Sequence, residues 1–333
     1  MINKLGKKKD MAYFLRKKTA GLLFIIFRYV LLITLGFVII TPLLKLLKSA
    51  LTDPSALGLN NSKWFPPAVS TEAFQVANIL INYWKALGYT LANTAFIVFL
   101  QTFSAALAGY SFARIKFKGS KILFGLVILT IIVPVQSVML AQYIAFRNFD
   151  IFGLVKLITG EEWNLLGNPI AIYILAATDM GLKGGLYIYI FRQFFRNLPV
   201  SIEEAAFVDG AGFLQTFFRI VLPSSRSSVM TVAVLSFVWN FGDTYYTALL
   251  NPTKYHMALR LTTIYSSVIQ ALKTANNNKL IPPTFDFIFD NPLYQNAVAS
   301  ACSLLVIIPL LIIYLFIQKK FVQGVERSGL GGE

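Results

Sequence analysis

The sequence has very few of the residues from which catalytic and metal sites are usually built. Its 333 residues include a single cysteine, Cys302, and a single histidine, His256. One cysteine excludes an internal disulfide and a cysteine-rich metal site, and one histidine removes the commonest general base from almost every position. A phosphate-binding loop of the G-x-x-x-x-G-K-[S/T] type is also missing. We therefore predict that the chain is not an enzyme and binds no metal or cofactor of its own.

Charged residues are also scarce, and acidic residues are the scarcer kind. Charged residues make up 14% of the chain, whereas hydrophobic residues make up 56%. Soluble domains average about 25% charged residues, so we expect lipid to be part of the solvent of this chain. The net charge of +15 does not indicate nucleic acid, because the basic residues cluster beside apolar segments, as membrane orientation signals do.

Six segments are apolar and long enough to cross a bilayer as helices, which takes about 20 residues. They are residues 22–44, 88–112, 122–146, 169–194, 227–250 and 296–317. The second, third and sixth are unambiguous. The fourth contains Asp179 and Lys183, and we expect a broken or tilted helix there. The first has an apolar run about twice as long as a signal-peptide core and no small-residue cleavage site after it, which predicts an uncleaved span.

Basic residues predict which way these spans point. They are concentrated before the first span, in the short loop after the second span, and in the tail: Lys4, Lys7, Lys8, Lys9, Arg16, Lys17 and Lys18; Arg114, Lys116, Lys118 and Lys121; Lys319, Lys320 and Arg327. Because loops rich in lysine and arginine stay in the cytoplasm, we predict that both termini are cytoplasmic, as is the segment 195–226. We expect a basic N-terminus (1–21), a membrane domain (22–318) and a C-terminal tail (319–333).

One stretch between the fourth and fifth predicted spans does not look membrane-embedded. Residues 201–223 read "SIEEAAFVDGAGFLQTFFRIVLP". Ser201 and Glu204 have the spacing of a capping box at a helix start, and Gly210 can take the positive φ that ends a helix. A second helical run follows, with Phe213, Phe217, Ile220 and Val221 on one face, and Pro223 ends it. The stretch predicts a helical hairpin over about 199–224.

The composition of this hairpin leaves two interpretations open. Small Ala205 and Ala206 would let another surface approach the first helix closely, and an acidic side chain at a fixed position would offer an ion pair to a partner. Alternatively, the hairpin only connects two spans.

The hairpin also carries a known motif. The pattern E-A-A-x-x-x-G-x9-I-x-L-P is matched by Glu204, Ala205, Ala206, Gly210, Ile220, Leu222 and Pro223. It resembles the signature of the permease subunits of ABC importers. The wider stretch "FRQFFRNLPVSIEEAAFVDGAG" resembles the carbohydrate branch, in particular the second permease of maltose-type importers. The stretches "WFPPAVSTEAF", "LANT" and "QKKFVQGVERSGLGG" are similar to other elements of that family.

This resemblance implies an all-α membrane protein with six transmembrane helices and both termini in the cytoplasm, the type I ABC importer permease fold. The hairpin would be the coupling helix that docks on an ATPase subunit, through Glu203, Glu204, Ala205, Ala206, Asp209, Gly210, Ile220, Leu222 and Pro223. The tail residues Phe321, Gln323 and Gly324 would also reach the ATPase.

The resemblance further implies the partners and the location. The partners would be a second homologous permease, two P-loop ATPase subunits that hold ATP and Mg²⁺, and an extracellular substrate-binding protein, either a lipoprotein or periplasmic. The chain would lie in the bacterial plasma membrane and carry a sugar, in particular an oligosaccharide.

Charged and aromatic residues within the spans are candidates for the translocation path: Asp179, Lys183, Trp239, Asn240, Asp243, Tyr245 and Tyr246. Intramembrane charges are costly and often functional, and aromatic rings and amides suit a sugar. The plainer interpretations are a structural pair between Asp179 and Lys183, which would share a helix face, a misplaced span boundary, and aromatic residues of the membrane interface.

The external loop 251–295 has two interpretations. Five of its apolar residues fall on one helical face: Leu261, Ile264, Tyr265, Val268 and Leu272. This face would contact a substrate-binding protein or would lie on the bilayer surface.

Two other functions compete with a sugar importer. An ABC permease for a non-sugar substrate, such as a peptide, would share the hairpin and differ only in its cavity. An ion-coupled secondary transporter would use Asp179, Lys183 or Asp243, but it leaves the full E-A-A match unexplained.

Overall fold

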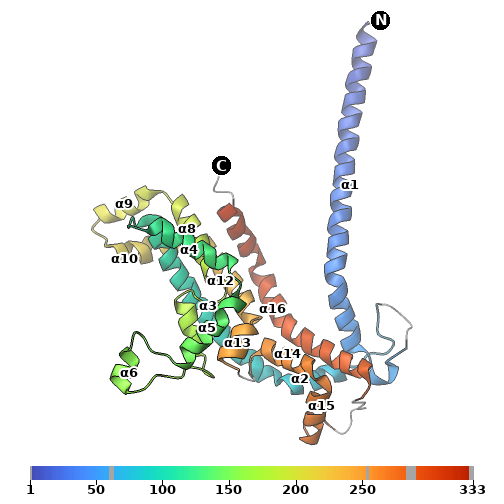
Figure 1. Cartoon of the computed structure of the whole chain (residues 1–333). Helices are drawn as coiled ribbons and strands as arrows, with labels where there is room; N and C mark the ends of the chain where they lie inside the picture. The colour runs from blue at the N-terminus through green and yellow to red at the C-terminus, as the bar shows by residue number, and fades with distance from the viewer. Residues whose placement is uncertain (1, 60–63, 253–254, 283–289, 330–333) are drawn as a thin grey trace. The chain divides into compact units, whose positions relative to one another are not determined.

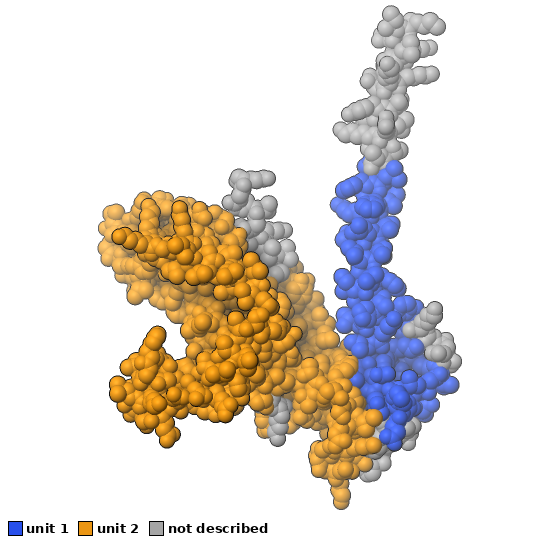
Figure 2. Space-filling view, viewed as in Figure 1, with its two compact units in different colours: residues 1–74, 285–301 blue, residues 75–284, 302–333 orange. Residues whose placement is uncertain are grey.

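The computed structural model describes the backbone of residues 2–59, 64–252, 255–282 and 290–329, and side chains only between residues 21 and 319 of these. Within the described residues every regular element is helical, and only two isolated β-bridges are found (Figure 1). The all-α class predicted from the sequence is therefore confirmed. The chain divides into two compact units, residues 1–74 with 285–301 and residues 75–284 with 302–333 (Figure 2).

Unit 1 holds the first helix and the start of the last one. Helix α1 covers Ile2–Leu51 and is followed by the 3₁₀ turn η1 (Pro54–Ala56), while α16 (Pro292–Gly329) begins here. The Asp53 carboxylate accepts hydrogen bonds from the Ser55 hydroxyl and backbone N–H, which lower the pKa of Asp53. This cap fixes the chain where it leaves α1.

Unit 2 holds the remaining helices. They are α2 (Glu72–Ile81, which starts in unit 1), α3 (Tyr83–Arg114), α4 (Ser120–Ile132), α5 (Val135–Arg147), α6 (Leu154–Thr159), α7 (Ile170–Ala177), α8 (Gly184–Asn197), α9 (Val200–Val208), α10 (Phe213–Thr216), η2 (Phe217–Val221), α11 (Leu222–Ser224), α12 (Arg226–Phe241), α13 (Tyr245–Leu250), α14 (Met257–Ser266) and α15 (Val268–Asn277). Helix α3 contacts α7, α8 and α12, so it is the central helix of the unit.

Helices α3 and α8 approach each other unusually closely. A Cβ atom added at Gly109 of α3 would lie 2.6 Å from Cβ of Phe191 and 2.9 Å from the backbone nitrogen of Arg192. Only glycine leaves room for this contact between helix backbones. Buried rings of Tyr187, Phe191 and Phe195 then fill the space beside it.

Three helices are long and apolar enough to cross a membrane among the described residues: Gly21–Leu51, Tyr83–Arg114 and Pro292–Lys319. Two further pairs qualify only if each bent pair counts as one span, namely Ser120–Ile132 with Val135–Arg147 and Phe213–Ser224 with Arg226–Phe241. The described helices therefore provide three to five candidate spans, compared with the six predicted.

The third predicted span, 122–146, is not one continuous helix. It breaks at Pro134 into α4 and α5, whose axes differ by 106°. Proline has no N–H to continue the helical hydrogen bonds, and it pushes the residue before it out of the helical region. Val133 accordingly has the extended backbone angles φ −66° and ψ 123°.

The fourth predicted span, 169–194, is also broken, as expected from its polar residues. Helix α7 ends at Ala177, and α8 begins at Gly184. Between them Asp179 and Lys183 have φ of 52° and 60°, the left-handed region that cannot continue an α-helix. Asp179 and Lys183 therefore share no helix face, and that part of the prediction is wrong.

The described residues of the loop 251–295 form two helices where one continuous apolar face was predicted. Helices α14 and α15 are separated at Ser267, which has φ −157° and ψ 72°. Ile264 and Leu272 are buried, whereas Tyr265 is 51% exposed and donates or accepts a hydrogen bond with Ser303 of α16. The break at Ser267 divides the predicted face between two helices.

Candidate functional site

Residues 199–224 form the predicted hairpin. Helix α9 ends in a turn in which Gly210 has φ +83° and the N–H of Ala211 bonds the carbonyl of Ala206 at 2.9 Å. The positive φ predicted for Gly210 is thus confirmed.

Two local details of the hairpin differ from the prediction. Pro199 occupies the N-cap position of α9 and no side chain caps the helix, so Ser201 lies inside the helix and forms no capping box. The second helical run passes through a π-helical turn, η2, and continues past Pro223 to Ser224. Pro223 lies in α11, directly after this π-helical turn.

The two neighbouring acids of the hairpin lie in opposite environments. Glu203 is 5% exposed, and its carboxylate accepts hydrogen bonds from Nε of Arg114 at 2.7 Å and from the hydroxyl of Tyr110 at 3.0 Å. Nη2 of Arg114 donates to the carbonyl of Leu198 at 2.7 Å. Glu204 is exposed and forms no hydrogen bond or ion pair with any described residue. Consecutive helical residues point about 100° apart, so one acid faces α3 and the other faces away.

Aromatic packing holds the hairpin against α3 and α8. The ring of Tyr110 lies 5.6 Å from Phe195 of α8, and 5.1 Å from both Phe213 and Phe217 of the hairpin, measured between ring centroids. These distances are in the range of favourable aromatic pairs. In Figure 1, α8, α9 and α10 accordingly group together at one end of unit 2.

The other side of the hairpin exposes apolar side chains. Ile202, Phe207, Val208 and Leu214 are 42%, 46%, 87% and 62% exposed. Several predicted docking residues share this exposure: Glu204, Ala205, Asp209, Gly210 and Pro223. Ile220 and Leu222 are half-buried, whereas Glu203 and Ala206 are buried against the rest of unit 2. An exposed patch of this kind is typical of a surface that meets a partner.

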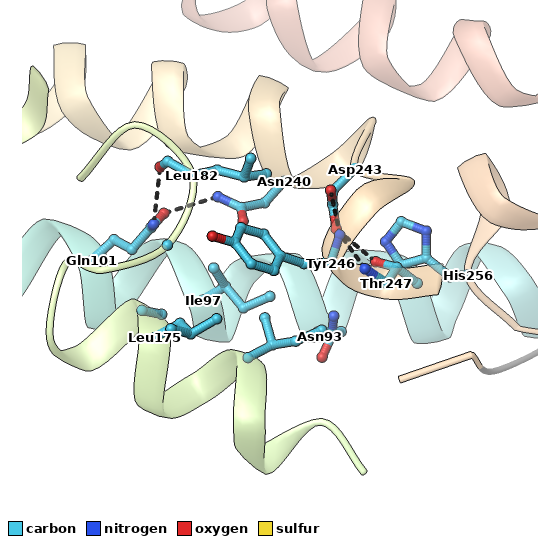
Figure 3. Close-up of a pocket in the computed structure, with 13 residues that line it drawn as sticks. Asn93, Ile97, Gln101, Leu175, Leu182, Asn240, Asp243, Tyr246, Thr247 and His256 are labelled. Atoms are coloured by element: carbon cyan, nitrogen blue, oxygen red, sulfur yellow. Dashed lines mark hydrogen bonds between the residues drawn. The ribbon is translucent and has the colours of Figure 1, made fainter. Parts of the chain in front are cut away.

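A second polar group lies in the interior of unit 2, where α3, α12 and the segment between α7 and α8 meet (Figure 3). The Gln101 side-chain oxygen accepts a hydrogen bond from the Asn240 amide at 2.9 Å, while its NH₂ group donates to the carbonyl of Leu182 at 3.2 Å. The same oxygen also accepts a hydrogen bond from the Ser236 hydroxyl at 2.6 Å. All three side chains are buried. Buried polar groups need such partners, so this network fixes α12 and the start of α8 onto α3.

Asp243 has a structural role at the end of α12. Its carboxylate accepts hydrogen bonds from the backbone N–H groups of Tyr245, Tyr246 and Thr247 and from the Thr247 hydroxyl. These are the unpaired donors at the start of α13, so Asp243 caps that helix (Figure 3).

The space among these interior side chains is small. The cavity lined by Gln101, Asn240, Asp243 and His256 has a volume of about 10 Å³, far below that of any organic ligand. Burial lowers the pKa of His256 to about 4, so its imidazole is neutral near pH 7. A larger apolar groove of about 880 Å³ runs between α3 and α12, lined by residues that include Phe99, Phe103 and Met230.

Replacing Gln101 by leucine is expected to destabilise the protein by about 1–3 kcal/mol. The change removes the acceptor of the Ser236 hydroxyl and the donor to the Leu182 carbonyl, whereas the Asn240 amide keeps its hydrogen bond to the Ser236 carbonyl at 2.8 Å. Thermal unfolding of the purified protein in detergent checks this. The same change at Gln270, which is exposed on α15, is the matched control and should leave the unfolding midpoint unchanged. An equal midpoint for both variants would show that the network contributes little.

The sequence matches a known family over most of unit 2 and the end of the chain. The model of the binding-protein-dependent transport system inner membrane component family matches residues 101–327, more than half of the chain. The chain belongs to this family.

Several individual permeases are similar along most of the chain. The maltodextrin transport system permease protein MdxG of Bacillus subtilis is 29% identical, over 94% of this chain and 99% of the relative. The melibiose/raffinose/stachyose import permease protein MelC of the same organism is 28% identical, over 84% of this chain and 88% of the relative. The galactooligosaccharides transport system permease protein GanQ, also from B. subtilis, is 27% identical, over 78% of this chain and 76% of the relative.

A solved structure has the same fold. It belongs to a bacterial ABC transporter involved in the import of the acidic polysaccharide alginate, and it matches with a TM-score of 0.65 and 19% identity, over 90% of this chain and 96% of that chain. This similarity supports the overall permease fold that the sequence predicts.

The residues predicted for the translocation path of this permease differ in their exposure. Nζ of Lys183 lies 4.7 Å from the ring centroid of Trp239, which is 46% exposed, and Tyr245 is 51% exposed. Asn240, Asp243 and Tyr246 are buried, and the Tyr246 hydroxyl donates to Gln142 at 2.8 Å.

Asp179 does not pair with Lys183 in this permease. Neither carboxylate oxygen of Asp179 has a hydrogen-bond partner among the described residues. The two ion pairs found in the described part of the chain are Arg114–Glu203 and Lys156–Glu162. The predicted pair is therefore wrong, because the break between α7 and α8 separates the two side chains.

Three of the residues predicted to contact an ATPase lie in the C-terminal tail. The side chains of Phe321, Gln323 and Gly324, predicted to contact an ATPase, lie outside the described ones. Tyr110 and Gln101 were not among the residues predicted from the sequence, and Arg114 was predicted only as part of the basic loop. A polar residue in an apolar span is a signal that would have found Gln101.

Proposed function

We propose that this permease is the membrane-spanning subunit of an ATP-driven, binding-protein-dependent importer for an oligosaccharide. The observation that carries the proposal is the hairpin 199–224. It has the full E-A-A motif, it is held firmly to α3 and α8, and it exposes Glu204 among apolar side chains. A surface of that composition fits a cleft on another protein, where Glu204 would pair with a basic group.

The proposed ATPase contact uses the exposed side of the hairpin. Glu204, Ala205, Asp209, Gly210 and Pro223 are exposed there, and the tail residues Phe321, Gln323 and Gly324 would add a second contact. Ile220 and Leu222 support the second helical run from its half-buried side. The chain itself does no chemistry, because ATP and Mg²⁺ are held by the partner subunits.

The proposed arrangement in the membrane has six crossings. The third, fourth and fifth are interrupted at Pro134, at residues 178–183 and at residues 242–244. An even number of crossings puts both termini on the same side, and the basic residues near the ends favour the cytoplasm. The hairpin then faces the ATPase, while the loop 251–295 faces the substrate-binding protein. The bacterial plasma membrane is the proposed location.

In the proposed transport cycle, the hairpin transmits the movement of the ATPase subunits to the permease. A substrate-binding protein delivers the sugar, and a second permease completes the path. The two ATPase subunits close on ATP and move the hairpins, which turns the permeases from inward-facing to outward-facing. Hydrolysis resets the cycle.

The proposed substrate class rests on the relatives. Those named above carry maltodextrin, galactooligosaccharides, and melibiose, raffinose or stachyose, so their substrates are all short sugar chains. The exposed rings of Trp239 and Tyr245 supply the stacking surfaces that sugars use.

Co-purification tests this proposal. The tagged chain is isolated from its native membrane in mild detergent, and the proteins that accompany it are identified by mass spectrometry. We expect a P-loop ATPase and a second permease, and ATP-dependent uptake of maltodextrin, galactooligosaccharide or raffinose but not of a peptide. A chain isolated alone, with uptake that does not need ATP, would overturn the proposal and favour ion coupling through Asp179 or Lys183.

A further inference from the structure

The buried acid of the hairpin, Glu203, joins the hairpin to the central helix of unit 2. Its carboxylate is held from two sides, by Arg114 at 2.7 Å and by Tyr110 at 3.0 Å. Both partners belong to the last two turns of α3. Arg114 also bonds the carbonyl of Leu198, just before α9. The contact therefore connects the end of α3 to both the start and the first turn of the hairpin.

The burial of this group makes the contact stiff. The side chain of Arg114 is 13% exposed and that of Glu203 is 7% exposed. A charge-assisted hydrogen bond is strong where water cannot replace it, and breaking such a pair leaves an unpaired buried charge. The rings of Phe213 and Phe217 pack on Tyr110 beside it. The hairpin thus cannot tilt against α3 without breaking this contact.

Helix α3 continues from this contact to the polar interior. Gln101 lies on the same helix, about 20 Å from Arg114 at a rise of 1.5 Å per residue. Its side chain holds Ser236 and Asn240 of α12 and the carbonyl of Leu182 before α8. One helix therefore carries both the hairpin contact and the network that ties the neighbouring helices together.

We propose that Glu203, Arg114 and Tyr110 form a rigid joint through which hairpin movement is transmitted to α3. This inference rests on the proposed function, since it takes the hairpin as the ATPase contact. Glu203 and Glu204 then have separate tasks: Glu204 binds the ATPase, and Glu203 is a positioning residue that fixes the hairpin to the membrane helix.

The test compares variants in the complete complex isolated through the tagged chain. Glu203→Gln removes the charge of the joint at nearly constant shape. The exchange Arg114→Glu with Glu203→Arg restores opposite charges in reversed order. The control is Glu162→Gln, because Glu162 belongs to an exposed ion pair whose atoms are 4.0 Å apart.

Two measurements separate coupling from docking. The first is the amount of ATPase that co-purifies with the chain and its rate of ATP hydrolysis. The second is the distance between spin labels at Gln215→Cys on the hairpin and Lys116→Cys after α3, two exposed positions that are not among the docking residues, with and without ATP. The native Cys302 is buried and should not be labelled.

In the otherwise unchanged chain we expect one narrow distance distribution, the same with and without ATP. In Glu203→Gln we expect the ATPase to co-purify within twofold of the control amount, while the distribution becomes at least twice as wide. The exchange Arg114→Glu with Glu203→Arg should make the distance distribution narrow again. Glu162→Gln should match the unchanged chain.

Three outcomes are decisive. A Glu203→Gln complex with an unchanged narrow distribution overturns the joint and leaves the importer assignment standing. Loss of the ATPase in Glu203→Gln that the charge exchange does not reverse also overturns it, because Glu203 would then act in docking. If no ATPase co-purifies even with the unchanged chain, the proposed function is wrong, and the proposed role of Glu203, Arg114 and Tyr110 is wrong with it.

Discussion

Replacing Glu204 by lysine is expected to separate the permease from its ATPase while leaving the permease folded and inserted. Glu204 is exposed and bonds no described residue of its own chain, so the change should not disturb the hairpin. A lysine would face the basic group that Glu204 is proposed to meet, and losing a charge pair at an interface costs about 2–5 kcal/mol. We therefore expect binding weaker by about 30-fold or more, with uptake lost in proportion.

The measurement is ATPase co-purification and sugar uptake by cells that carry the variant. The matched control is Glu161→Lys, which makes the same charge change at another exposed acid, in the segment after α6. It should behave as the unchanged chain. If Glu204→Lys keeps the ATPase and normal uptake, the hairpin is not the coupling element.

Replacing Gly109 by alanine is expected to loosen the contact between α3 and α8. The new Cβ would lie 2.6 Å from Cβ of Phe191 and 2.9 Å from the backbone nitrogen of Arg192, closer than such atoms can approach. Overpacking of this kind costs about 1–3 kcal/mol, so the unfolding temperature in detergent should fall.

Gly88 provides the comparison in the same helix. No described atom lies within 4 Å of a Cβ added there, and alanine favours a helix over glycine by about 1 kcal/mol. Gly88→Ala should therefore unfold at the same temperature or higher. Equal melting of the two variants would show that α3 and α8 can move apart at little cost.

The sequence predicted the hairpin well because its signals are local. The motif residues are close together, and Gly210 turns the chain through its own backbone freedom. The break at Pro134 also had a local signal, the proline itself, but the uniformly apolar segment around it was read as one span.

The roles of the two adjacent acids could not be predicted in the same way. Glu203 and Glu204 are chemically equivalent in the sequence, and which of them is buried depends on Arg114, 89 positions away along the chain. The pairing of Gln101 with Ser236, 135 positions away, is likewise a product of packing. Contacts of this kind exist only once helices from distant parts of the chain have come together.

The close approach at Gly109 also limits how this permease can change shape. A helix pair whose backbones touch cannot slide lengthwise, because the next turn of α3 carries a side chain where Gly109 has none. Helices α3 and α8 must therefore travel as a single rigid body. Any change in the angle between α7 and α8 then has to be taken up in residues 178–183, where Asp179 and Lys183 have left-handed backbone conformations.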